Sequence, residues 1–199
     1  MLIIGHRGAK GLEAENTIRS FQKAQELGVD MIETDLRLQN GEIVLNHDPL
    51  KNGAKYPTLN ELLAIARVPL NLEIKEAGFE EQVLRSIKGF TYKVLITSWN
   101  PRVLKKIRTL DGNIAIGPVV GYKYCFFLPI VVMLLKNLNI YSITIGPELV
   151  NSKRMKRFKK LGWKVFPFTV NNPVQFEELQ KLGVDGVFTD FPNIIKNYD

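Results

Sequence analysis

The chain has 199 residues, of which 45% are hydrophobic, and a formal net charge of +7. This length suits one sizeable core, so we expect a single domain over residues 1–199. Cys125 is the only cysteine, which excludes a disulfide-rich scaffold. We expect it to be a small buried hydrophobe in a protein of the reducing cytoplasm.

The apolar stretches are too short for membrane insertion. Leu2–Ile4 runs almost directly into His6 and Arg7, which leaves no room for the apolar region of a signal peptide. The longest apolar run, 125–135, falls short of the roughly 18–20 residues that span a bilayer. We expect a buried helix there and a cytoplasmic location.

Strand-like and helix-like segments alternate along the chain, which is typical of parallel βα units. The predicted strands are 2–5, 31–36, 43–47, 70–75, 93–97, 113–117, 140–145, 164–169 and 186–189. The predicted helices are 17–27, 58–66, 79–88, 101–109, 124–137, 149–161, 173–182 and 193–197. Asn16 and Asn100 stand where helix caps are expected.

Nine strands are one more than an eight-stranded barrel uses. Seven residues separate Asp35 from Ile43, and they include the turn dipeptide Asn40-Gly41. A parallel crossover needs about a dozen residues, so 43–47 should return as an antiparallel hairpin arm. We therefore predict an α/β fold, a compact (β/α)₈ TIM barrel with a β-hairpin arm after its second strand. The alternative is a doubly wound open sheet.

Three carboxylates fall at or near strand ends, where active sites of such barrels lie. Glu33 and Asp35 are two residues apart on one strand and therefore point to the same side. Glu73 ends a later strand and can complete the set. Ligation by oxygen alone favours Mg²⁺ or Ca²⁺ over zinc.

The two histidines of the chain, His6 and His47, belong to the same group of strand-end residues. Histidine titrates near neutrality, so one can take a proton from a nucleophile while the other protonates a leaving alkoxide. Arg7 and Lys75 supply positive charge for an anion. These residue types together predict a metal-assisted phosphate-ester site.

The position of His47 presents a difficulty of register. With Asn40-Gly41 as a two-residue turn, His47 pairs opposite Thr34, on the wrong face for the carboxylates. We therefore expect a β-bulge or a longer loop that shifts the arm by one residue.

A basic segment lies late in the chain, with cations throughout 153–160 and Met155, Phe158 and Leu161 as its apolar stripe. We interpret it as a solvated helix with one core-facing side. The alternative is a basic helix that meets anionic lipid or nucleic acid. Zinc-finger spacing and RNA-binding signatures are missing from the sequence, so we expect no nucleic-acid partner.

Taken in order, these motifs resemble the glycerophosphodiester phosphodiesterase family. The matching motifs are His6-Arg7-Gly8, Glu15-Asn16-Thr17, Glu33-Thr34-Asp35, His47-Asp48-Pro49, Leu72-Glu73-Ile74-Lys75 and the closing segment 183–190. The resemblance implies a barrel, a divalent cation and hydrolysis of a small glycerophosphodiester to an alcohol and sn-glycerol 3-phosphate, within lipid and glycerol metabolism. By position it implies acid/base roles for His6 and His47, metal ligation by Glu33, Asp35 and Glu73, and phosphate binding by Arg7 and Lys75.

Two features depart from the family pattern. Twenty-five residues separate His47 from Glu73, where the family usually carries a longer insertion that caps the site. Lys51–Pro57 is therefore a short cap over an open site. The family's late Trp-Thr-Val-Asn appears here with Phe168 in place of tryptophan, either as an apolar wall for the glycerol or as barrel packing.

An open rim leads to two further hypotheses. The apolar segment 122–135 and the basic helix 150–161 predict a peripheral membrane contact. The alternatives to glycerophosphodiester hydrolysis are lysophospholipase D-type hydrolysis of lysophospholipids, and a non-catalytic barrel that binds glycerol phosphate or a lipid headgroup. A lost catalytic residue would favour the non-catalytic barrel, and none is missing.

Overall fold

The computed structural model describes residues 1–121 and 126–198. Its strands are β1 (Leu2–Gly5), β2 (Met31–Gln39), β3 (Glu42–Leu45), β4 (Leu70–Ile74), β5 (Val94–Ser98), β6 (Ala115–Val120), β7 (Ser142–Ile145), β8 (Lys164–Pro167) and β9 (Gly186–Thr189). Its helices are α1 (Ile18–Glu26), α2 (Leu59–Ile65), α3 (Glu80–Ser86), α4 (Pro101–Leu110), α5 (Leu128–Leu135), α6 (Ser152–Lys160), α7 (Pro173–Leu182) and α8 (Pro192–Ile195), with short 3₁₀ turns η2 (Pro147–Leu149) and η3 (Lys196–Tyr198).

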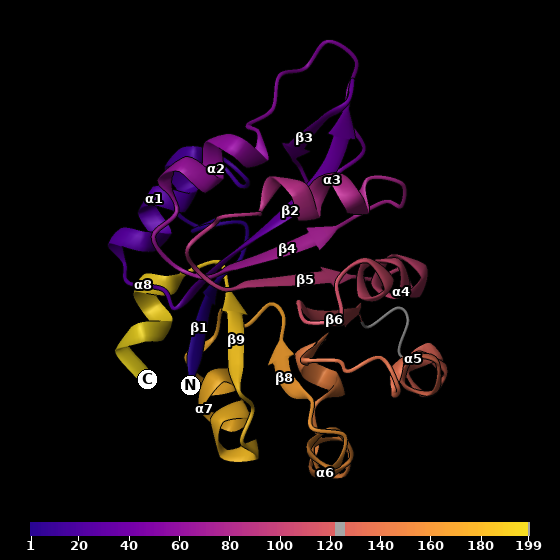
Figure 1. Cartoon of the computed structure of the whole chain (residues 1–199). Helices are drawn as coiled ribbons and strands as arrows, with labels where there is room; N and C mark the ends of the chain where they lie inside the picture. Colours follow the sequence, from indigo (N-terminus) through magenta and orange to yellow (C-terminus); the bar gives the residue numbers. More distant parts are fainter. Residues whose placement is uncertain (122–125, 199) are drawn as a thin grey trace.

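Eight parallel strands form a nearly closed barrel with the helices outside it (Figure 1). Their order is β8-β7-β6-β5-β4-β2-β1-β9. Within the described residues no strand ladder joins β8 to β9, yet the backbone N–H of Asp185 donates to Val165 (3.0 Å) and that of Val170 to Phe188 (2.8 Å). The ends of the sheet therefore meet, which confirms the predicted (β/α)₈ barrel and excludes the open sheet.

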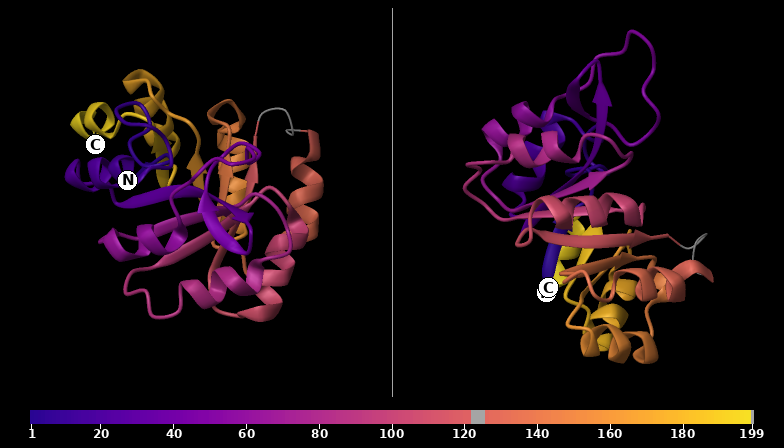
Figure 2. Two further views of the ribbon diagram at one scale, coloured as in Figure 1. Left: turned by 90° about the horizontal axis from the view of Figure 1, so that it is seen from above. Right: turned by 45° about the vertical axis from the view of Figure 1, so that its right-hand side comes forward.

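The hairpin arm is confirmed, but the expected irregularity in it is wrong. β3 pairs antiparallel with β2 from Gln39↔Glu42 to Leu36↔Leu45. Asn40 and Gly41 form a two-residue turn, and both have positive φ, as a type I′ turn requires. The ladder contains no bulge, and β3 ends at Leu45. The right-hand view of Figure 2 shows the arm and the loop after it projecting above the barrel.

The barrel interior is filled from below by apolar side chains. Ile4, Met31, Leu95, Phe166 and Phe188 form a buried cluster that is separate from the larger layer between sheet and helices. Side chains alternate along a strand, so the residues two positions further along each strand also point inward. Four of the five positions at that next level, at the carboxyl ends of the strands, are polar, and the fifth is Phe168.

The helix predicted over 124–137 is shorter and less buried than expected. α5 begins at Leu128, and Cys125 lies outside the described residues. Leu128, Val132 and Leu135 are buried on its inner side, whereas its outward side chains are exposed. The expectation of a buried helix is therefore wrong for half of its surface. Within residues 1–121 and 126–198, no helix is both long and apolar enough to cross a membrane.

Candidate active site

A cavity of about 490 Å³ opens at the carboxyl ends of the barrel strands. Its lining includes seven of the eight predicted site residues: His6, Arg7, Glu33, His47, Glu73, Lys75 and Phe168. The eighth, Asp35, is 1% exposed and does not line the cavity, but it contacts two of the lining cations. Residues from five separate segments of the sequence are thus gathered in one place.

Three carboxylates converge on the side of the cavity formed by β2 and β4. Glu33, Asp35 and Glu73 each offer an oxygen, and these oxygens lie within 4.8 Å of one another. Burial raises the pKa of Glu33 well above its ordinary value, and the neighbouring charges of Asp35 and Glu73 raise it further. Burial and the Asp35 charge also raise the pKa of Glu73, although Lys75 opposes this. The cluster is therefore short of positive charge.

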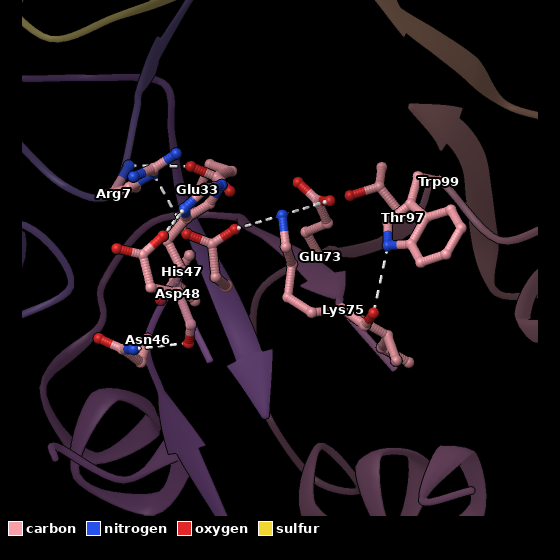
Figure 3. A network of polar contacts seen from close by, with 12 residues as sticks. Arg7, Glu33, Asn46, His47, Asp48, Glu73, Lys75, Thr97 and Trp99 are labelled. Carbon is pink, nitrogen blue, oxygen red and sulfur yellow. Dashed lines mark hydrogen bonds and ion pairs between the residues drawn. The ribbon is translucent and has the colours of Figure 1, made fainter. Parts of the chain in front are cut away.

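Two cations lie against these carboxylates (Figure 3). The Lys75 ammonium is 2.9 Å from Oε1 of Glu73 and 3.3 Å from Oδ1 of Asp35. Arg7 places Nε 3.2 Å from Oδ2 of Asp35 and donates two hydrogen bonds of 2.9 Å to Glu15. Burial alone would raise the pKa of Asp35, but Lys75 and Arg7 hold it below its ordinary value. Asp35 therefore stays ionised although it is buried.

The loop after β1 is shaped to bring Arg7 to the carboxylates. Arg7 has a φ of 51°, and its backbone N–H donates to Oε2 of Glu33 at 2.8 Å. Asn16 was expected as a helix cap, but Thr17 caps α1 instead. The Asn16 side chain donates to Oδ2 of Asp35 (3.0 Å) and accepts from the Thr34 hydroxyl (2.8 Å). The Glu15-Asn16-Thr17 motif therefore holds both Arg7 and Asp35.

His6 is held by a partner that the sequence reasoning did not identify. Its Nδ1 lies 2.7 Å from Oδ1 of Asp190, which follows β9. The Asn171 side chain donates to the other oxygen of Asp190 (2.8 Å) and accepts from the Asp190 backbone N–H (2.8 Å). Burial would raise the pKa of Asp190, but the hydrogen bonds from His6 and Asn171 bring it below its ordinary value. An ionised Asp190 fixes the proton of His6 on Nδ1 and leaves Nε2 as an acceptor.

His47 reaches the cavity without the expected bulge. Regular pairing continues as far as the Asn46 N–H, which donates to the Asp35 carbonyl at 3.1 Å. Beyond that point the chain leaves the ladder, and the Arg37 guanidinium donates to the His47 carbonyl at 2.7 Å. Nδ1 of His47 lies 2.9 Å from Oδ1 of Asp48, a side chain that is 79% exposed. The chain thus presents two His–Asp pairs, one buried and one exposed.

The side of the cavity away from the carboxylates is mainly apolar. Phe168 lies edge-on to Phe188, with ring centroids 6.4 Å apart. Trp99 follows β5, lines the cavity while 55% exposed, and donates from its indole N–H to the Lys75 carbonyl (3.2 Å). The sequence reasoning missed Trp99, although its place directly after a strand was a usable signal. The cavity therefore has one charged side and one apolar side.

Comparison with known proteins agrees with this geometry. Residues 6–81 and 65–194 match the Glycerophosphoryl diester phosphodiesterase family. The glycerophosphodiester phosphodiesterase of Caldanaerobacter subterraneus subsp. tengcongensis is 31% identical over 242 residues, covering 98% of this chain and 96% of that protein.

Solved structures share the fold. A phosphodiesterase of Oleispira antarctica, solved in complex with the product sn-glycerol-3-phosphate, has a TM-score of 0.88 at 24% identity, covering 100% of this chain and 96% of that one. The glycerophosphodiester phosphodiesterase of Thermotoga maritima has a TM-score of 0.86 at 23% identity, covering 100% and 98%. The chain therefore belongs to the glycerophosphoryl diester phosphodiesterase family and is a phosphoric diester hydrolase.

Proposed function

We propose that this chain hydrolyses glycerophosphodiesters to an alcohol and sn-glycerol 3-phosphate, with a divalent cation and two histidines as proton carriers. The observation that carries the proposal is the convergence of three carboxylates and two histidines on one cavity. The related Oleispira antarctica phosphodiesterase was solved with that product, which supports the same substrate class here. A complete acid/base set disfavours the alternative of a binding-only barrel.

The donor set fits a hard cation. Two oxygens on opposite sides of a bound Ca²⁺ are about 5 Å apart, because each bond is about 2.3–2.6 Å, and the three carboxylate oxygens lie within 4.8 Å. Glu33, Asp35 and Glu73 would hold Mg²⁺ or Ca²⁺, which both prefer oxygen ligands. When bound, the cation would polarise the phosphate oxygens and offset charge that develops on them.

The two histidines are proposed to exchange protons with the substrate through Nε2. Both use Nδ1 to contact an aspartate, so both keep Nε2 available to the cavity. One histidine takes a proton from the attacking water as the new P–O bond forms. The other donates a proton to the oxygen of the leaving alcohol as the old P–O bond breaks.

Arg7 and Lys75 are proposed to bind the phosphate. Each lines the cavity beside the carboxylates. Burial alone would lower the pKa of Lys75, but Glu73 and Asp35 raise it above its ordinary value, so the ammonium stays charged. A buried cation interacts strongly with developing negative charge because water does not screen it. Arg7 adds a planar guanidinium that matches phosphate oxygens.

Phe168 is proposed to form the apolar wall against the carbon atoms of the substrate, together with Trp99. Thr144 also lines the cavity, and its buried hydroxyl has no hydrogen-bond partner among the described residues. A substrate hydroxyl would satisfy it, as buried polar groups require.

Release of glycerol 3-phosphate from glycerophosphocholine and glycerophosphoethanolamine tests the proposal. The assay is run after EDTA treatment and again with added Mg²⁺ or Ca²⁺. We expect EDTA to abolish release and one of the two cations to restore it. Glu73→Gln should require a higher cation concentration, while the surface control Glu26→Gln should behave like the wild type. Full activity in EDTA would refute the metal site.

A further inference from the structure

The helix α5 carries an apolar surface that the proposed reaction does not use. Three residues of α5 and the two that directly precede Leu128 are exposed large hydrophobics: Phe126 (87%), Phe127 (55%), Ile130 (48%), Met133 (61%) and Leu134 (43%). We name these five residues the α5 patch. Every residue from 126 to 135 is apolar, so the helix has no polar side for water. Helices on the outside of a barrel normally present charged side chains outward, and contiguous exposed apolar surface usually marks a contact site.

The neighbouring helix α4 shows what an ordinary outer helix of this barrel looks like. It contacts α5 and buries Val103, Leu104 and Ile107 against the barrel. Its outward positions carry exposed Arg102 and Lys105. α5 also buries one apolar stripe, but it carries Ile130, Met133 and Leu134 at outward positions in place of charges. The difference lies in the outward side chains and not in the packing of the helix.

Positive charge flanks the α5 patch on both sides. Figure 1 places α5 between α4 and α6 on the outside of the barrel. The exposed cations of these two helices are Arg102, Lys105 and Lys106 on α4 and Lys153, Lys156, Arg157, Lys159 and Lys160 on α6. From residue 99 to residue 165 the sequence has two acidic residues, Asp111 and Glu148, against thirteen lysines and arginines. An apolar strip between two rows of cations is complementary to an anionic lipid surface.

The α5 patch also lies close in the chain to the mouth of the cavity. Val119, the last but one residue of β6, and Gly121, directly after β6, line the cavity, and Phe126 comes five residues after Gly121. Trp99, on the preceding βα loop, is half-exposed at the same rim. Contact between the α5 patch and a membrane would therefore bring the active-site end of the barrel near the lipid headgroups.

We propose that the α5 patch docks the enzyme peripherally on anionic membranes, with α5 lying in the headgroup region and the cations of α4 and α6 contacting acidic headgroups. α5 has eight residues, so it lies on the bilayer and does not span it. This docking is independent of the hydrolytic mechanism, because no residue of the α5 patch lines the cavity.

Vesicle flotation of the full chain tests the docking. Vesicles of phosphatidylcholine with phosphatidylglycerol are compared with vesicles of phosphatidylcholine alone. We expect the wild type to float with the anionic vesicles and to be released as salt rises, because screening shortens the range of the charges. The double variant Phe126→Ser/Met133→Ser should bind the anionic vesicles at least about tenfold more weakly than the wild type, since each inserted apolar side chain adds favourable transfer free energy.

A matched control separates this surface from general hydrophobicity. Tyr198→Ser removes an aromatic side chain that is 47% exposed in η3, at the carboxyl end of the chain and on the side opposite α5 in Figure 1. This variant should float like the wild type. Hydrolysis of glycerophosphocholine without vesicles should be the same in all three proteins, so a failure of catalysis would be seen separately from a failure of docking.

Three results would overturn the proposal. The first is a wild type that does not float with anionic vesicles at low salt. The second is equal flotation of the wild type and the double variant. The third is that analytical ultracentrifugation shows a dimer for the wild type and a monomer for the double variant, while neither protein binds vesicles. That result would assign the α5 patch to contact with a second copy of this chain.

Discussion

Replacing Asp190 with asparagine tests the orientation of His6 without changing the size of the side chain. Asn171 constrains the new amide, because its Nδ2 donates to one Asp190 oxygen and its Oδ1 already accepts from the Asp190 N–H. The asparagine must keep its oxygen toward Asn171, so its NH₂ faces Nδ1 of His6. His6 is then forced to accept at Nδ1 and to carry its proton on Nε2. In that state Nε2 cannot accept a proton as a base, and the imidazolium that a general acid needs is disfavoured.

The expected loss of rate in Asp190→Asn can be estimated from the distance between His6 and Asp190. Nδ1 of His6 and Oδ1 of Asp190 are 2.7 Å apart, and opposite unit charges at that separation attract by about 6 kcal/mol at an effective dielectric constant of about 20. The side chains are 11% and 16% exposed, so solvent screens part of this attraction. Loss of about half of it, about 3 kcal/mol, lowers the rate by about 10²-fold, and the wrong tautomer adds to the loss.

The assay is kcat/KM for glycerophosphocholine as a function of pH, together with the imidazole ¹⁵N shifts of His6, which report the tautomer. We expect Asp190→Asn to lower kcat/KM about 10²–10³-fold and to move the proton to Nε2 with an unchanged circular dichroism spectrum. The matched control is Asp48→Asn, because Asp48 is 79% exposed beside His47 and water can replace it, with a loss of about fivefold or less. A kcat/KM for Asp190→Asn within about threefold of the wild type, or an unchanged tautomer, would refute this reasoning.

Three further predictions concern catalysis, pH and stability. His6→Ala and His47→Ala should each lower kcat about 10²–10⁴-fold with an unchanged melting temperature; near-normal turnover of either would exclude the two-histidine mechanism. Because the pKa of Glu33 is raised in the folded state, the metal-free protein binds an extra proton and should lose stability as pH rises above the ordinary value of 4.5 toward that raised pKa. Melting curves in EDTA across this pH range should show a melting temperature that falls as pH rises. The same fall in Glu33→Gln would contradict its assignment to Glu33. Gly8→Ala should destabilise by about 2–4 kcal/mol, because a Cβ would lie 2.4 Å from a serine hydroxyl at a φ of +87°. Gly41 also has a positive φ, +84°, but a Cβ there would meet no atom within 4 Å among the described residues. Denaturant titration of Gly41→Ala should therefore show a loss of about 1 kcal/mol in the free energy of unfolding. Equal losses of unfolding free energy in the two variants would rule out the steric cause.

The fold could be predicted because its signals are local. Alternating strand and helix patterns gave the βα order, and Asn40-Gly41 identified the hairpin. The bulge was predicted on the assumption that His47 belongs to the ladder. The strand ends before it, because Arg37 binds the His47 carbonyl and the chain turns away. A contact between a guanidinium and a carbonyl ten residues apart leaves no trace in hydrophobic periodicity.

The candidate site also contains residues that could be predicted from the sequence and residues that could not. Ionisable residues at strand ends, such as Glu33 and Lys75, could be identified because burial of an unpaired charge costs free energy, so such residues are expected only where they face a site. The supporting residues could not. Asp190 lies 184 positions from His6, and its role depends on barrel closure. Asn16 looks like a helix cap from its position, and only the tertiary structure shows that it binds Asp35 instead.

Barrel closure has a consequence for catalysis. In the described residues β8 and β9 share no strand ladder, and Asn171 after β8 instead clasps Asp190 after β9 with two hydrogen bonds of 2.8 Å. Asp190 is also the partner of His6. One of the contacts that close the barrel, alongside the backbone hydrogen bonds between the β8 and β9 segments, therefore also holds the partner of a proposed proton carrier. If that seam opens, His6 loses the partner that orients it, so under the proposed mechanism the rate of turnover would report whether the barrel is closed.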